Sequence, residues 1–352
     1  MKKIYLHIGC EKTGTTSLQR FLLENGELLD KAGLSYLANN ERAYFEGHAH
    51  FPIPNYILGG MQDFVSIAKD NRKMELVSEL HCDIEELVDR DIVLSSEHFS
   101  SRMHGADDIF RLADMLKKYD VTVICYVRRQ DEMAVSSYST GVSCGRRESF
   151  GLDEADLHNP YYNYMIFLPR WEAAFGRDKI RVRKFGRSSQ RDWDIRADFL
   201  DVIGVQAELP PKSVDENVSL DAKQTETLRL INQVLPGFDM NNREAYQRAQ
   251  VVRGLLIPFV PLGAPLQAML SRSQSRNIMR RFADVNFQME QRYMEPGALA
   301  AWFEDDDADA GLPEGAPEAS ARPDAEELAR VIGALGEALQ QEMESRNGGA
   351  GT

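Results

Sequence analysis

The stretch that most restricts the fold lies at the start of the chain, in residues 3–19 (KIYLHIGCEKTGTTSLQ). Residues 4–8 are apolar and partly β-branched, which predicts a buried strand ending at Gly9. A helical pattern then begins at Thr15 or Thr16. A strand, a glycine-containing turn and a helix N-terminus form an anion-binding cradle, because backbone N–H groups and the helix dipole point at the turn. The sequence therefore predicts a site for a phosphorylated nucleotide.

The position of the lysine indicates which kind of loop this is. A Walker A loop reads G-x-x-x-x-G-K-[ST]. Gly9 and Gly14 have that separation, but Thr15 occupies the lysine position and the lysine lies inside the loop, at Lys12. The string KTGTTSLQ resembles the 5′-phosphosulfate loop of sulfotransferases that use 3′-phosphoadenosine 5′-phosphosulfate (PAPS). The resemblance implies a donor-binding loop of Lys12, Thr13, Gly14, Thr15, Thr16 and Ser17, with Lys12 also catalytic at the bridging oxygen of PAPS.

A second motif follows the most strand-like run of the chain, residues 121–127 (VTVICYV), which predicts a central parallel strand. Sulfotransferases carry an arginine at the end of this strand and a serine on the next helix, and both hold the 3′-phosphate of PAPS. Arg128 and Ser136 match that spacing, and a guanidinium suits a phosphate. The usual Asn-Pro after the arginine is replaced by Arg-Gln, which looks closer to bacterial relatives. The resemblance also makes Phe185 a candidate for packing near the adenine; a core or edge aromatic is the alternative.

A base is needed to remove the proton of the acceptor. Residues 91–99 predict a strand that ends in Ser-Ser-Glu-His, at the sheet edge where open α/β folds bind ligands. Glu97 stands where related enzymes place a catalytic His or Glu, and we expect it to be the base, with His98 and His48 as alternatives. A salt bridge from Glu97 to Arg128 is a structural alternative. We predict no metal site, because the family works without a metal and the histidines lack partners at zinc spacing.

Further elements follow from hydrophobic periodicity and turn residues. Residues 31–37 and 178–185 predict strands, and residues 39–60 predict a loop. Helices are predicted over residues 64–89, 107–119, 164–175, 194–204 and 217–231, the last capped near Ser219. The predicted fold class is α/β: a three-layer, P-loop-like fold with a central, mostly parallel sheet flanked by helices, plus a helical C-terminal portion.

Composition changes after Phe303 and divides the chain. Residues 1–303 resemble the sulfotransferase family, which implies a sulfotransferase-like α/β domain over this range. Residues 304–323 are acidic, small and proline-containing, which predicts a disordered linker. Residues 324–345 have an apolar stripe at helical spacing and predict an amphipathic helix. That helix must dock on the body of the protein, on a second copy or on a partner.

Overall composition limits the partners and the compartment. The formal net charge of −14 argues against general nucleic-acid binding. The four cysteines have no C-x-x-C spacing, and Met1-Lys2-Lys3 leads directly into the first strand, so we expect a reduced, cytoplasmic chain without a signal peptide. The apolar residues 251–270 contain three prolines and therefore predict no transmembrane helix; they are expected in the core, with an acceptor pocket or a membrane-surface contact as alternatives.

The resemblance to sulfotransferases thus implies an enzyme that transfers a sulfuryl group from PAPS to a hydroxyl or amine. The transfer would be in line and metal-independent, with 3′-phosphoadenosine 5′-phosphate (PAP) as the product. The acceptor would be a small molecule, a carbohydrate or a lipid. Two alternatives remain: a P-loop kinase or NTPase, and a non-catalytic nucleotide-binding scaffold that uses the C-terminal helix.

Overall fold

The computed structural model describes residues 1–186, 193–211, 220–300, 323–333 and 336–337. The chain divides into two compact units. The first contains residues 1–129, 156–216 and 281–303, and the second contains residues 130–155, 217–280 and 304–352. The predicted linker lies almost entirely outside the described residues.

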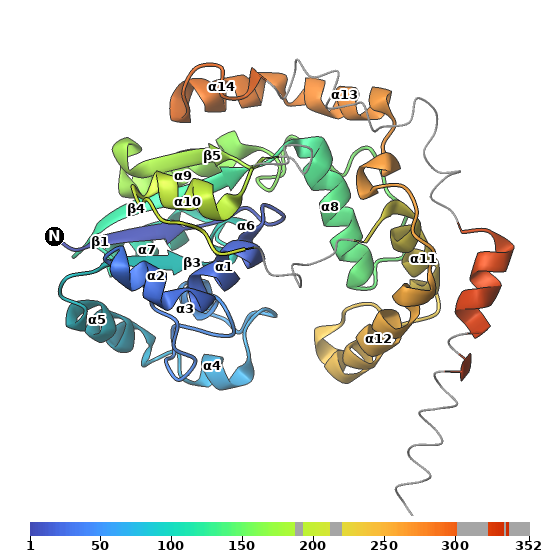
Figure 1. Ribbon diagram of the computed structural model, residues 1–352, viewed down its shortest axis with the longest axis horizontal. Helices are drawn as coiled ribbons and strands as arrows, with labels where there is room; N and C mark the ends of the chain where they lie inside the picture. The colour runs from blue at the N-terminus through green and yellow to red at the C-terminus, as the bar shows by residue number, and fades with distance from the viewer. Residues whose placement is uncertain (187–192, 212–219, 301–322, 334–335, 338–352) are drawn as a thin grey trace, which may run out of the picture. The chain divides into compact units, whose positions relative to one another are not determined.

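The first unit is built on a five-stranded sheet in the order β2-β3-β1-β4-β5, and every pairing in it is parallel (Figure 1). The strands are β1 (Lys3–His7), β2 (Leu34–Tyr36), β3 (Asp91–Ser95), β4 (Asp120–Val127) and β5 (Ile180–Lys184). The central strands β1, β3 and β4 are mostly buried, as their largely apolar sequences predict. The predicted α/β class with a parallel central sheet is confirmed.

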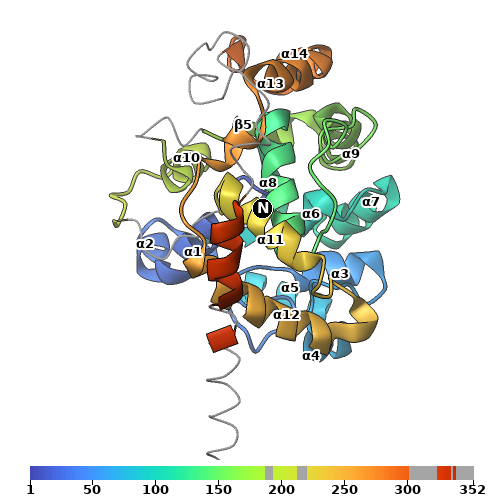
Figure 2. The same cartoon turned by 90° about the vertical axis from the view of Figure 1, so that its right-hand side faces the viewer.

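Helices cover both faces of this sheet. They are α1 (Thr15–Glu24), α2 (Gly26–Lys31), α3 (Pro52–Leu58), α4 (Ile67–Asn71), α5 (Leu76–Glu86), α6 (His98–Ser101), α7 (Ala106–Met115), α9 (Tyr164–Phe175), α10 (Ile195–Val202) and α14 (Ala283–Tyr293), with a short 3-10 turn η1 (Arg177–Lys179). Helices α1 and α10 pack together on one face, and α7 and α9 pack together on the other (Figure 2). This arrangement follows from right-handed crossovers that leave β1 and β4 in opposite directions.

Two local predictions need correction. Residues 39–60 are not entirely a loop, because Pro52–Leu58 forms α3; Pro52 and Pro54 lie in its first turn, where a missing N–H is tolerated. The helix predicted over residues 217–231 is α11 (Ala222–Asn232), and its N-cap is Asp221 rather than Ser219. Asp221 and Gln224 form a reciprocal capping box, in which Asp221 Oδ1 accepts from the Gln224 N–H at 2.8 Å.

The described part of the second unit is helical. Its elements are α8 (Gln130–Ser143), α11, η2 (Met240–Asn242), α12 (Arg243–Leu256), η3 (Ile257–Phe259), η4 (Leu266–Met269) and nearly all of α13 (Arg272–Arg281). Residues 325–333 form a further helix, within the range predicted for the C-terminal helix. Its Val331 packs into an apolar cluster with Leu256 and Val260. The stretch 251–270 is therefore partly core, although Phe259 and Leu262 are exposed.

Candidate active site

The loop between β1 and α1 has an unusual backbone. Gly9, Lys12 and Gly14 all have positive φ angles, of 58°, 66° and 72°. Lys12 is the one non-glycine residue with positive φ among the described residues. Such a conformation costs on the order of 1 kcal/mol or more and tends to occur at functional sites. The hydroxyl of Thr13 stabilises the loop itself, because its Oγ1 donates to the carbonyl oxygen of Cys10 at 2.5 Å.

Helix α1 begins directly at the end of this loop. Gly14 is its N-cap, and no side chain caps the helix. The first turn, which begins with the predicted ligands Thr15, Thr16 and Ser17, contains no acidic residue. The positive end of the helix dipole is therefore not neutralised by a carboxylate of its own first turn, and it faces the loop as an anion site would require.

Gly9 and Gly14 have no side chain, which lets one residue after β3 and one after β5 lie close to the loop backbone. A Cβ atom on Gly9 would lie 3.1 Å from Cα of Glu97, and one on Gly14 would lie 3.0 Å from Cε2 of Phe185. Both distances are shorter than ordinary van der Waals contacts. Glu97 follows β3 and Phe185 follows β5, so the loop is contacted by residues that follow strands on either side of β1.

Arg128 directly follows β4 and reaches the loop. One of its guanidinium nitrogens, Nη1, donates to the carbonyl oxygen of Lys12 at 2.8 Å. The guanidinium carbon also lies 5.4 Å from the centre of the Phe185 ring, within the range of a cation–π contact. Arg128 and Phe185 meet because Val127 and Lys184 are paired in the β4–β5 register.

The main chain of Arg128 is held by Tyr164, the first residue of α9. The backbone N–H of Arg128 donates to the Tyr164 hydroxyl at 3.0 Å, and that hydroxyl donates to the backbone carbonyl of Arg128 at 2.6 Å. Tyr164 is fully buried. Sequence reasoning did not find this residue, since 36 positions separate the two and no local pattern links them.

Glu97, the predicted base, is partly buried beside the same loop. Burial raises the pKa of its carboxyl group, and the nearby Glu11 raises it further, whereas a hydrogen bond from Gln19 and the charge of Lys12 lower it. The Gln19 side chain donates to Glu97 Oε2 at 2.9 Å. A raised pKa brings a carboxylate closer to the range in which it accepts a proton efficiently.

The two alternative bases have the opposite perturbation. Burial lowers the pKa of His98 to about 3, and its ring stacks on Phe64 with centroids 4.0 Å apart. His98 Nδ1 lies 3.9 Å from a carboxylate oxygen of Glu11. Burial also lowers the pKa of His48. Both imidazoles are thus weaker bases than an exposed histidine.

The structure therefore brings together Lys12, Arg128, Phe185 and Glu97 around one loop at the carboxyl edge of the sheet. Ser136 lies on α8 in the second unit, and its contact with a 3′-phosphate stays a prediction. Strands β1 and β4 are neighbours in the sheet, and the connections that leave them run in opposite directions, toward β2 and toward β5. Open α/β sheets bind ligands at such a point.

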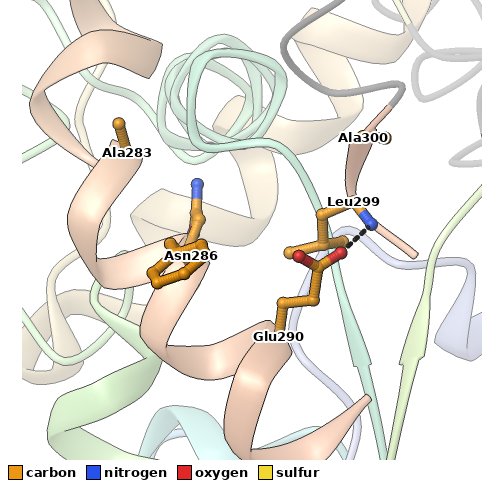
Figure 3. Close-up of a pocket in the computed structure, with 6 residues that line it drawn as sticks. Ala283, Asn286, Glu290, Leu299 and Ala300 are labelled. Atoms are coloured by element: carbon orange, nitrogen blue, oxygen red, sulfur yellow. Dashed lines mark hydrogen bonds between the residues drawn. The ribbon is translucent and has the colours of Figure 1, made fainter. Parts of the chain in front are cut away.

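Two hollows of the first unit involve other residues. A pocket of about 160 Å³ lies on α14, where the Glu290 carboxylate accepts a hydrogen bond from the Leu299 N–H at 2.6 Å (Figure 3). A larger hollow of about 710 Å³ lies along β5, and the residues that line it include Arg181, Arg183 and Lys184. None of the predicted site residues lines either hollow.

Two features are absent from the part of the chain that the structure describes. No group of three or more His, Cys, Asp or Glu side chains in that part of the chain is arranged to hold a metal ion. In the same residues, no helix combines the length and the apolar character needed to cross a membrane.

Comparison with known proteins gave limited similarities. No protein-family profile matches the chain. An uncharacterized protein of Archaeoglobus fulgidus is 25% identical over 203 residues, which cover 57% of this chain and 53% of that protein. The chain thus spans about half the length of this curated relative. Among solved structures, a sulfotransferase from Alicyclobacillus acidocaldarius is similar with a TM-score of 0.36 and 16% identity, over 66% of this chain and 93% of the other.

Proposed function

We propose that this protein is a sulfotransferase that transfers a sulfuryl group from PAPS to a hydroxyl or amine of an acceptor. The observation that carries the proposal is the contact between two sequence motifs: the guanidinium of Arg128 donates to the main chain of Lys12. Each motif alone resembles half of a PAPS site. Their contact in the fold supports a single site for a nucleotide with phosphates at both ends.

The donor-binding residues divide by the part of PAPS that they would hold. The N-terminus of α1, with Gly14 to Ser17, would hold the 5′-phosphate through backbone N–H and hydroxyl groups. Arg128 and Ser136 would hold the 3′-phosphate, and Phe185 would pack near the adenine. PAPS itself supplies a sulfuryl group joined to the 5′-phosphate through a bridging oxygen.

Lys12 and Glu97 would take part in the transfer itself, the first by stabilising negative charge and the second by accepting a proton. The ammonium group of Lys12 would stabilise the negative charge that develops on the bridging oxygen, which is the usual role of a positioned cation in group transfer. The Glu97 carboxylate would accept the proton of the acceptor. We propose a transfer without a divalent cation, because the ammonium group of Lys12 would supply the positive charge.

Calorimetric titration tests the donor site. We expect PAP to bind to the wild-type protein without added metal, and ATP with Mg²⁺ to bind much more weakly. Binding of ATP with Mg²⁺ in preference to PAP would instead favour a kinase or NTPase.

Substitution of Lys12 tests its role in the transfer. Lys12→Ala should reduce turnover of labelled PAPS by at least about 100-fold, the typical loss of one charge-stabilising donor. Lys3→Ala, which replaces an exposed lysine at the start of β1, is the control and should leave turnover unchanged.

Substitution of Glu97 tests the base. In Glu97→Gln we expect turnover to fall by about 100- to 10,000-fold, the range that general bases contribute, with PAP affinity retained. The measurement is release of PAP from PAPS, with a cell extract as the source of acceptors. Unchanged turnover would remove Glu97 from the mechanism and make His98 or His48 the next candidate.

A further inference from the structure

A chain of buried polar groups connects the proposed base to the interior of the sheet. Gln19 of α1 is fully buried. Its Nε2 atom donates to Glu97 Oε2 at 2.9 Å and to Ser95 Oγ at 3.1 Å. Ser95 Oγ in turn lies 2.8 Å from Nδ1 of His7, on β1. One side-chain amide therefore links α1, which follows the loop, to Ser95 at the end of β3 and to Glu97 just beyond it.

Packing alone does not account for an amide at this position. The neighbouring buried positions of α1 are Leu18, Phe21 and Leu22, so a leucine would suit the same face. An amide buried here must be satisfied by hydrogen bonds, and Gln19 Oε1 is buried without a hydrogen-bond partner among the described residues. The two N–H bonds are the interactions that offset this penalty, and one of them goes to Glu97.

We propose that Gln19 is a positioning residue for Glu97: its amide fixes the carboxylate beside the loop and stabilises its proton-accepting form. This inference rests on the proposed function, in which Glu97 is the base. A second donated bond, to Ser95, restrains the amide itself, so that its N–H groups rather than its oxygen face the carboxylate.

The charges around Glu97 make this bond important. Glu11 lies close enough to oppose ionisation, and Lys12 lies close enough to favour it. Burial, and to a smaller extent the charge of Glu97, raises the pKa of the Tyr36 hydroxyl, which donates to the His48 carbonyl at 2.7 Å. Without the Gln19 donor, burial and Glu11 would oppose ionisation of Glu97, and its own backbone N–H and the charge of Lys12 would be left to favour it. A hydrogen bond donated to the charged form of a carboxyl lowers its pKa, so its loss raises that pKa.

Gln19→Leu tests the proposal, with Gln62→Leu as a matched substitution outside the site. The carboxyl pKa of Glu97 is measured by NMR on protein labelled at the glutamate side-chain carboxyl carbon, and Glu97→Gln assigns the signal. We expect Gln19→Leu to raise the pKa of Glu97 by roughly one pH unit or more, and Gln62→Leu to leave it unchanged. The acidic limb of the PAPS turnover profile should move by the same amount, with PAP affinity retained.

Gln19→Asn is the second variant, for use if Gln19→Leu does not fold. It keeps the amide but shortens its reach by one methylene, so it should also raise the pKa of Glu97. An unchanged pKa in whichever variant folds would overturn the proposal. Failure of wild-type protein to bind PAP would refute the proposed function instead, and the NMR titration of Glu97 would remain readable.

Discussion

Lowering the pH from 7 to 5 should destabilise the first unit, because two of its histidines are buried in their neutral form. His7 and His50 are fully buried, and burial lowers the pKa of each to about 3. The ring of His50 accepts a hydrogen bond at Nδ1 from the backbone N–H of Ser95, at 3.1 Å. Protonation of that nitrogen would bring two N–H groups face to face.

The size of the effect follows from the two pKa values of each histidine. The unfolded chain takes up a proton near pH 6.5, whereas the folded chain does not do so until about pH 3. The unfolded state therefore binds more protons throughout this window, and stability falls as the pH falls. At pH 5 the loss is about 2 kcal/mol for each histidine. His98, whose pKa burial also lowers to about 3, adds a loss of the same sign. Carboxylates with lowered pKa values act below this pH range, and the raised pKa of Glu97 acts in the opposite direction.

The assay is guanidinium unfolding followed by tryptophan fluorescence at pH 7 and pH 5, with the free energy of unfolding obtained by linear extrapolation. His50→Asn removes the titrating group but keeps an oxygen that can accept the Ser95 N–H. We expect this variant to be less stable at pH 7, yet to lose about 2 kcal/mol less than the wild type between the two pH values. Equal losses in both proteins would refute the buried neutral state of His50.

Three further substitutions test other parts of the structure. Gly14→Ala should weaken PAP binding in calorimetry, because the positive φ and the 3.0 Å approach to Phe185 leave no room for a Cβ; unchanged affinity would count against this loop geometry. Arg128→Lys should reduce PAP affinity at least tenfold, since an ammonium cannot reproduce the planar guanidinium fork; equal affinity would show that a point charge suffices. Val331→Ala should lower the free energy of unfolding by about 1.6 kcal/mol, from two buried methyl groups, whereas Ile332→Ala, at an exposed site, should change it little.

The sequence was most informative where the relevant residues are close together in the chain. The strand, loop and helix of residues 3–24 and the strand that precedes Arg128 follow from hydrophobic periodicity and glycine positions, and the structure has them as predicted. That Lys12 and Arg128 belong to one site was predicted only through the resemblance to sulfotransferases. Their contact depends on β1 pairing with β4, which a single sequence does not specify.

The contacts that sequence reasoning missed are all between distant segments. Gln19 reads as one polar position on an amphipathic helix, and only the fold shows that it faces Glu97. The perturbed pKa values of His98 and Glu97 also depend on burial by other segments. The helix at Pro52–Leu58 was missed for a local reason, since prolines and glycines near residues 47–60 favour a loop unless the prolines fall in the first turn.

The two hydrogen bonds between the Tyr164 hydroxyl and the main chain of Arg128 have a consequence for ligand affinity. A single phenol satisfies both main-chain groups of the arginine, so the backbone at the end of β4 is fixed independently of any ligand. If Arg128 binds a phosphate as proposed, only its side chain has to be immobilised, so less conformational entropy is lost on association. The same phenol ties the strand to α9, so a displacement of that helix would be transmitted mechanically to the guanidinium.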